Sequence, residues 1–338
     1  MQTALLGDGR PLRYGALLGV GGIGSGAFFR LSGNETFGRE ESRLGRFLDQ
    51  RDYCKLHIIA HNVRALLGTA FSVIPLGRVG DDDPGRKLIG EMKQAGLDVR
   101  YVEVCPGEQT MYSICVQYPD GAGGNLTTED SACCRVDAAF VKRALPEFER
   151  YRGRGVALAA PETPLESRAA LLRLGTEYGF FRAASFNALE VPEAMQMGLF
   201  GHLDLLALNR SEAECLMNDD ADDPAHLAAR AIERLNRDYP NLSVSVTAGP
   251  AGAWLWDTRT VHFTPAIPVA VRNTAGAGDA HLAALIAGAV ASLETEQAHR
   301  LAGLVASYSV TSPHTIHPNL DGASLREFGA RSHVGLGL

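Results

Sequence analysis

The chain has 338 residues, of which 46% are apolar and 21% charged, and this composition excludes disordered and fibrous proteins. Its formal net charge of −7 comes without a basic stripe, so we expect neither nucleic acid nor an anionic membrane surface as a partner. With no apolar run as long as the about 20 residues of a membrane span and no signal-peptide pattern, the default expectation is a cytoplasmic protein whose six cysteines stay reduced.

Strand-like apolar runs alternate with amphipathic helical stretches through most of the chain. The first expected strand, 14–18, leads into the turn 19–24, which matches the pattern G-x-G-x-x-G. In dinucleotide sites a continuous helix and then an acidic residue at the end of a second strand must follow this pattern. Ser32, Gly33 and Asn34 interrupt any such helix here. An NAD-dependent dehydrogenase is therefore the less favoured interpretation.

The later apolar runs each end in a polar or glycine-rich turn. Their alternation with helices predicts an α/β fold with a mainly parallel central sheet flanked by helices. No Pro- or Ser-rich linker and no repeat divides the chain, so we expect one domain over residues 1–338. Ligands of such sheets gather at the carboxyl ends of the strands. The expected strands are 71–77, 155–160, 180–186, 203–208 and 242–247, with a helix at 86–93.

Two stretches break this pattern. Residues 31–49 are rich in Gly, Arg and Glu and have little helical periodicity, whereas residues 112–121 alternate like a half-exposed strand that ends in a turn. The two stretches are predicted to pair as a small β-sheet appendage, formed by segments at approximately 28–50 and 108–128.

The segment Asn273-Thr274-Ala275-Gly276-Ala277-Gly278-Asp279 runs directly into the apolar helix expected at 280–290. Small residues allow a turn to present several backbone N–H groups at a helix N-terminus, where the unpaired amides and the macrodipole favour an anion such as phosphate. A carboxylate beside that anion is suited to accept a proton from a group that attacks it. An ordinary glycine-rich helix start with a favourably placed Asp is the alternative interpretation.

This segment resembles the second signature, D-T-x-G-A-G-D, of the ribokinase-like (PfkB) carbohydrate kinases and differs from it only at the first position. The resemblance implies an anion hole formed by Gly276, Ala277 and Gly278, with Asp279 as the general base. It also implies a ribokinase-like three-layer fold with a β-sheet lid at the two irregular segments, ATP and Mg²⁺ as cofactors, and a small hydroxyl-bearing substrate. The exposed edge of such a lid favours a homodimer.

Further motifs occur in the order that this family has them. The segment that starts at Asn209 resembles its N-x-x-E motif, which implies that Glu212 helps to hold Mg²⁺ through water. Residues 247–252 resemble its T-x-G-x-x-G turn, residues 78–85 its V-G-D-D-x-x-G turn, and Glu162 lies in a segment like its strand-end E-S-P-L-E-S. An ordinary turn with a helix cap explains 78–85 equally well. The nucleotide-side residues implied by the resemblance are Asn187, Asn209, Glu212, Thr247, Gly249, Gly252, Thr274 and Ser309.

The acceptor side departs from the family. Residues 55–59 stand where the first signature has a glycine pair and an Asn, and Gly26 stands where the first strand leads to an Asp. Asn273 replaces the first Asp of the second signature, which leaves activation by a monovalent cation open. The candidate acceptor-binding residues are Ser25, His57 and Asn62.

The sequence thus predicts an ATP-dependent phosphotransferase that acts on an alcohol group of a sugar, sugar acid or nucleoside. Because the acceptor side is altered, the alternative is a non-catalytic protein that binds a nucleotide or metabolite on a kinase scaffold.

Overall fold

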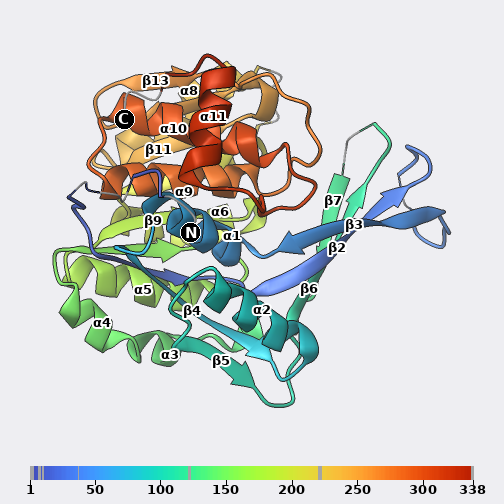
Figure 1. Cartoon of the computed structure of the whole chain (residues 1–338), viewed down its shortest axis with the longest axis horizontal. Coiled ribbons are helices and arrows are strands. Elements are labelled where there is room, and N and C mark those ends of the chain that lie inside the picture. Colours follow the sequence, from blue (N-terminus) through green and yellow to red (C-terminus); the bar gives the residue numbers. More distant parts are fainter. Residues whose placement is uncertain are drawn as a thin grey trace.

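Two β-sheets organise the chain in the computed structural model, which describes residues 4–6, 9, 11–36, 38–120, 123–219 and 223–335. A nine-stranded sheet lies between layers of helices, and a four-stranded sheet projects from one side of it (Figure 1). This arrangement confirms the predicted three-layer α/β fold with a small β-sheet lid. Among the described residues, no helix is both long enough and apolar enough to cross a membrane.

The large sheet has the strand order β13-β12-β11-β10-β9-β8-β1-β4-β5. Neighbouring strands pair in parallel except at one edge, where β12 pairs antiparallel with both β11 and β13. The central strand β1 is buried along its whole length, as expected for a parallel strand covered on both faces. The strands are β1 (Ala16–Val20), β4 (Ser72–Gly80), β5 (Tyr101–Cys105), β8 (Gly155–Ala159), β9 (Phe181–Ser185), β10 (Leu205–Asn209), β11 (Ser243–Thr247), β12 (Ala253–Trp256) and β13 (Val261–Thr264).

Helices cover both faces of this sheet. Leu17 and Leu18 are neighbours on β1 and point to opposite faces, and each belongs to a separate buried apolar cluster. The Leu17 side is covered by α1 (Lys55–Leu67), α2 (Asp83–Gln94), α9 (Ala277–Val290), α10 (Thr295–Ser309) and α11 (Gly322–Arg331). The Leu18 side is covered by α3 (Ala138–Lys142), α4 (Leu145–Arg150), α5 (Leu165–Glu177), α6 (Val191–Gln196), α7 (Arg210–Met217) and α8 (Pro224–Asp238).

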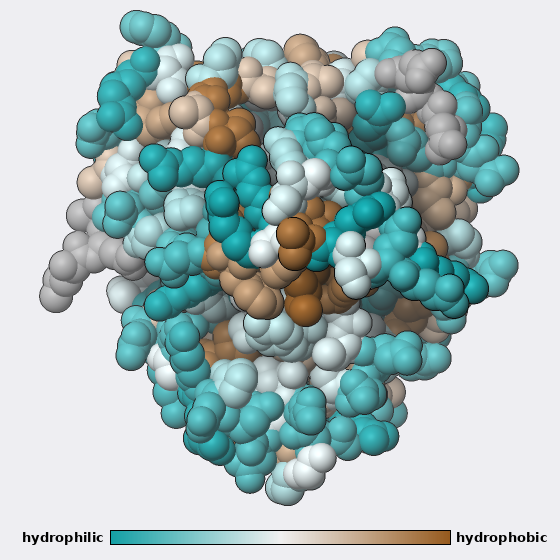
Figure 2. Space-filling view, turned by 90° about the vertical axis from the view of Figure 1, so that its right-hand side faces the viewer, coloured by the Kyte–Doolittle hydropathy of each residue, from teal (hydrophilic) through white to brown (hydrophobic). Residues whose placement is uncertain are grey.

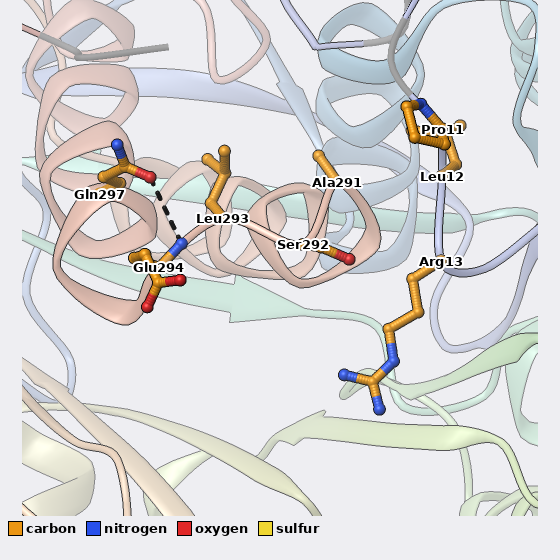
Figure 3. Close-up of a pocket in the computed structure, with 8 residues that line it drawn as sticks. All are labelled: Pro11, Leu12, Arg13, Ala291, Ser292, Leu293, Glu294 and Gln297. Atoms are coloured by element: carbon orange, nitrogen blue, oxygen red, sulfur yellow. Dashed lines mark hydrogen bonds between the residues drawn. The ribbon is translucent and has the colours of Figure 1, made fainter.

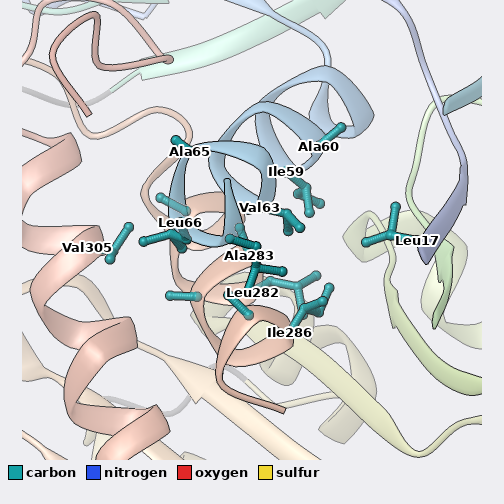
Figure 4. Close-up of a cluster of buried hydrophobic side chains, with 14 of the residues drawn as sticks. Leu17, Ile59, Ala60, Val63, Ala65, Leu66, Leu282, Ala283, Ile286 and Val305 are labelled. Atoms are coloured by element: carbon teal, nitrogen blue, oxygen red, sulfur yellow. The ribbon is translucent and has the colours of Figure 1, made fainter. Parts of the chain in front are cut away.

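Helix α9 is buried on nearly all sides. Its sequence is apolar all round, which is typical of a helix enclosed by other elements. Figure 4 shows Leu282 and Ile286 of α9 packed against Ile59 and Val63 of α1, with Val305 of α10 on another side. Such close packing fixes the position of α9 and therefore of the residues at its N-terminus.

The lid has the strand order β3-β2-β6-β7, formed by β2 (Gly24–Leu31), β3 (Gly45–Tyr53), β6 (Met111–Gln117) and β7 (Gly123–Thr127). β2 starts directly after the glycine-rich turn that follows β1, where a dinucleotide-binding unit would need a helix. The two lid segments predicted from the sequence contain these strands in large part, and their residues 37, 121 and 122 lie outside the described residues. The remaining short helices are η1 (Ala132–Arg135), η2 (Ala188–Glu190), η3 (Leu199–His202) and η4 (Gly249–Ala251).

Candidate active site

The N-terminus of α9 is built around a glycine in the left-handed conformation. Gly276 caps the helix with φ = 81°, and a Cβ atom there would lie 2.9 Å from the carbonyl oxygen of Thr315. Only glycine fits this position without strain. The amide of Ala277 donates to the carbonyl of Thr274 (3.3 Å), whereas those of Gly278 and Asp279 donate to none of the described residues. Two backbone donors of the predicted site are thus available to an anion.

Asp279 is in the first turn of α9. Burial raises the pKa of this carboxyl to about 7, the charges of Glu162, Glu212 and Asp52 raise it as well, and Lys55 opposes the rise. A carboxyl group whose pKa lies near neutral pH exchanges its proton readily under physiological conditions. The position and the proton affinity of Asp279 both suit a general base.

Lys55, the first residue of α1, lies among these carboxylates. Its Nζ donates to Asn187 Oδ1 (3.1 Å) and lies 3.8 Å from Glu212 Oε1. Burial favours the neutral amine, but the carboxylates of Asp279, Glu212 and Glu162 outweigh this effect and raise the pKa of Lys55. The side chain is therefore a permanent cation beside Asp279.

Asn187 and Glu212 are held in place by capping interactions at two neighbouring strand ends. Glu212 Oε2 and Oε1 accept hydrogen bonds from the backbone N and from Nδ2 of Asn209 (2.8 and 2.9 Å). The backbone N of Asn187 donates to Glu190 Oε2 (2.9 Å), and Glu190 forms an ion pair with the buried Arg168 of α5. Burial raises the pKa of Glu212, and Lys55 opposes the rise.

Glu162 follows β8 with a left-handed backbone (φ = 75°), which is unfavourable for any residue with a Cβ atom. Such strain concentrates at functional sites. Its Oε2 accepts a hydrogen bond from the backbone N of Lys55 (3.0 Å), at the positive end of α1. A Cβ atom at Gly22 would lie 2.5 Å from Glu162 Cβ, so close packing against this carboxylate accounts for a glycine of the G-x-G-x-x-G turn.

The other predicted nucleotide-side residues lie along the same edge of the sheet. Asn209 and Thr247 are register partners at the carboxyl ends of β10 and β11. Gly249 and Gly252, in the turn that follows β11, both have positive φ angles (53° and 98°). Ser309 lies at the end of α10, where its hydroxyl donates to the carbonyl of Ala306 (2.8 Å). Thr274 contributes its carbonyl to the α9 turn.

The predicted acceptor residues are spread over three environments. The His57 ring is buried against Tyr53, with 4.8 Å between centroids, and burial together with His61 lowers its pKa to about 3. Asn62 is buried within α1. Ser25 lines a cavity of about 310 Å³ between the lid and α2. The structure shows no contact between any of the three and Asp279.

A cavity of about 540 Å³ lies between residues 11–13 and the connection from α9 to α10, and none of the predicted site residues lines it (Figure 3). Asn273 Nδ2 donates to the carbonyl of Pro313 (3.0 Å), so the amide that replaces the family's Asp links the turn to the 312–315 loop. The described residues contain no group of three or more His, Cys, Asp or Glu side chains that could hold a metal ion.

Lys55 was missed by the sequence reasoning. It resembles none of the family's signature positions, and its charge partners come from strands far apart in the chain. One signal was available: a cation at the first position of a helix is disfavoured by the macrodipole. A lysine at the first position of an apolar helix therefore indicates that anions lie nearby.

A model of the pfkB family of carbohydrate kinases matches residues 60–321 of the chain. Deoxyribokinase of Salmonella typhi is 27% identical over 254 residues, which cover 72% of this chain and 77% of that protein. Fructokinase of Klebsiella pneumoniae is 30% identical over 226 residues, covering 64% and 70%. 2-Dehydro-3-deoxygluconokinase of Thermoproteus tenax is 25% identical over 220 residues, covering 61% of this chain and 63% of that protein's length.

Solved structures with the same fold cover nearly the whole chain. Ribokinase from Cryptococcus neoformans var. grubii in complex with ADP has a TM-score of 0.77 at 18% identity, covering 93% of this chain and 99% of that one. A nucleoside kinase from Burkholderia thailandensis in complex with inosine has a TM-score of 0.74 at 16% identity, covering 93% and 98%. At these identities the likeness establishes the fold, and it confirms the predicted ribokinase-like architecture.

Proposed function

The chain belongs to the pfkB family of carbohydrate kinases, and from this premise we propose that it transfers the γ-phosphoryl group of ATP to a hydroxyl group of a small polar metabolite. The observation that carries the proposal is Asp279, a carboxyl with a pKa of about 7 that lies in the first turn of α9 beside free backbone amides and the cation Lys55. The names of the relatives support a sugar, a sugar acid or a nucleoside as the acceptor.

In the proposed reaction Asp279 takes the proton of the acceptor hydroxyl. The acceptor oxygen then attacks the γ-phosphorus in line, the bond to the bridging β,γ oxygen breaks, and ADP leaves. The free amides of Gly278 and Asp279 and the ammonium group of Lys55 stabilise the negative charge on the transferred group. The chain thus contributes a base, an anion site and a fixed cation, which is mainly positioning and electrostatics.

Glu212 fits Mg²⁺ only through water. Both of its oxygens accept hydrogen bonds from Asn209, and Oε1 lies 3.8 Å from Lys55 Nζ, so direct coordination would disrupt the cap of α7. Mg²⁺ typically keeps several waters and uses one or two carboxylates together with substrate phosphates. When bound, the ion supplies positive charge to the β- and γ-phosphates.

Acceptor-dependent ADP release tests the proposal. Purified protein with ATP and Mg²⁺ is expected to release ADP in the presence of at least one member of a panel of sugars, sugar acids and nucleosides. Asp279→Asn should lower kcat by roughly 10²- to 10⁴-fold, because a positioned general base is lost, while calorimetry shows ATP binding within about twofold of the original. Near-normal turnover by this variant would contradict the assignment of the base.

The same panel of acceptors distinguishes the proposed kinase from the alternative, a non-catalytic binding protein. ATP binding without acceptor-dependent ADP release across all three classes would favour a binding protein on a kinase scaffold.

A further inference from the structure

Asp52, on the lid strand β3, is a buried carboxylate that the proposed chemistry has not used. Only 7% of the residue is exposed. In the lid it pairs with Gly26 of β2, which in turn pairs with Ser113 of β6, so the three residues share one face of the lid sheet. Oδ2 accepts hydrogen bonds from Ser113 Oγ (2.6 Å) and Cys115 Sγ (3.2 Å). Oδ1 has no hydrogen-bond partner among the described residues.

The Asp52 carboxylate fits into this sheet only because position 26 has no side chain. A Cβ atom at position 26 would lie 2.8 Å from Asp52 Oδ2 and 2.2 Å from Ser113 Oγ. The glycine on β2 and the aspartate on β3 therefore depend on each other. The sequence shows that β2 lacks a carboxylate at this point, and the structure shows that the neighbouring strand supplies one.

The Asp52 carboxylate lies within electrostatic range of Glu162 and Asp279. Its negative charge contributes to the raised pKa of both Glu162 and Asp279, which follow β8 and begin α9. Three carboxylates from three separate parts of the chain thus lie within range of one another's fields. Lys55, the cation among them, is bonded toward Asn187 and Glu212, on the nucleotide side.

We propose that Asp52 binds neighbouring hydroxyl groups of the acceptor through Oδ1, and that the acceptor is a neutral polyhydroxy compound rather than a sugar acid. The inference rests on the proposed kinase function. Asp52 lines the cavity of about 310 Å³ between the lid and α2, where Oδ1 can accept a charge-assisted hydrogen bond from an acceptor hydroxyl. An acceptor with its own carboxylate would instead add a further negative charge beside Asp52, Glu162 and Asp279.

The test compares Asp52→Asn with Asp49→Asn, an exposed change of the same kind on the same strand. With the best acceptor of a panel of ribose, fructose, inosine and 2-dehydro-3-deoxygluconate, Asp52→Asn is expected to raise the acceptor KM by roughly 10- to 100-fold and the ATP KM by less than about twofold. Asp49→Asn should leave both unchanged. A neutral compound should be the best acceptor of the unmodified protein.

Monodeoxy analogues of that acceptor identify the bond itself. At least one analogue should have a raised KM with the original protein but the same KM as its parent with Asp52→Asn, because the partner of the missing hydroxyl is gone. Ser113→Ala, which breaks the link within the lid but keeps the carboxylate, should raise the acceptor KM by less than about threefold.

Three results would overturn the inference while leaving the kinase function intact. They are an unchanged acceptor KM in Asp52→Asn, equal losses in Asp52→Asn and Ser113→Ala, which would assign Asp52 to lid stability alone, and a preference of the unmodified protein for the sugar acid. Absence of turnover with every acceptor would instead overturn the kinase function on which the inference rests.

Discussion

At Asp279 two opposing influences set the proton affinity of the carboxyl group. Burial and the neighbouring carboxylates favour the protonated form and raise the pKa to about 7, whereas Lys55 favours the ionised form. Only the ionised carboxylate can accept a proton from the acceptor. As pH falls through about 7 the ionised fraction falls, so kcat/KM measured at low ATP and low acceptor, which reports the free enzyme, should fall on the acid side of neutrality.

Lys55→Met should shift the fall of kcat/KM on the acid side to higher pH. The substitution removes the cation that lowers the pKa of Asp279, so a higher pH is needed to ionise the base. The ATP KM should also rise, because one positive charge near the phosphates is lost. The measurement is the pH profile of kcat/KM, with Lys93→Met as a control, since that lysine is exposed in the last turn of α2. If the acid-side fall of kcat/KM stays at the same pH or moves to lower pH in Lys55→Met, Lys55 does not act on Asp279.

The site residues differ in how far the sequence could predict them. Asp279 and the glycines beside it lie within one short segment, so their spacing alone indicates an anion site with a base. Lys55, Glu162 and Asp52 come together only when β3, α1 and β8 are arranged in space. Their partners depend on strand register and on a strained backbone at Glu162, and neither feature has a local signal.

At the scale of elements, the start of α9 and the base of the lid are joined by hydrogen bonds. The backbone N of Arg51, near the end of β3, donates to His314 Nδ1 (3.0 Å), and its carbonyl accepts from the backbone N of Thr315 (3.1 Å). The backbone N of Tyr53 donates to Thr315 Oγ1 (3.1 Å). Because the carbonyl of Thr315 also lies against Gly276, the loop at 314–315 connects the anion site with the strand that carries Asp52.

Gly276→Ala and Gly278→Ala should therefore have different effects. Alanine at position 276 would have to adopt φ = 81° with its Cβ atom 2.9 Å from the carbonyl oxygen of Thr315, so the free energy of unfolding should fall by about 1–3 kcal/mol. At position 278 nothing lies within 4 Å of the added Cβ atom, and stability should be unchanged. Urea unfolding measures both. Equal stability of the two variants would contradict a steric requirement for glycine at 276.

Gly278→Ala carries a second expectation. Its Cβ atom would stand in the open space beside the free amides, where the transferred phosphoryl group is proposed to bind. The stable variant should therefore have a raised ATP KM or a lowered kcat in the ADP-release assay. A stable variant with normal kinetics would indicate that phosphate does not approach this turn.

The strands of the large sheet were easier to predict than the pairing within the lid. In the sequence, the strands of the large sheet are short apolar runs because both of their faces are buried, as in β8 and β1. The lid strands β3 and β7 are largely exposed, so their sequences carry little hydrophobic signal. The irregular register between β2 and β3, near Ala27 and Phe29, could not be derived from either strand alone.

At the scale of the whole molecule, the lid has a second face opposite the one that carries Asp52. Strand register places Phe47, Tyr112 and Leu126 together on this face, and these side chains are exposed to 64%, 41% and 66%. Figure 2, which views the molecule from the lid side, shows apolar side chains gathered near the centre of a largely hydrophilic surface. An apolar patch with a polar rim is typical of a protein interface.

We expect this lid face to pair with the lid of a second copy and form a homodimer. Sedimentation velocity of the unmodified protein should show a dimer. Phe47→Asp should raise the dissociation constant by roughly 100-fold or more, because the substitution removes a large side chain that the dimer would bury and places a charge in an apolar contact. Val261→Asp, a change at an exposed position of β13 far along the other sheet, should leave the dimer intact. A monomer at all concentrations, or equal dissociation of both variants, would exclude the lid as the interface.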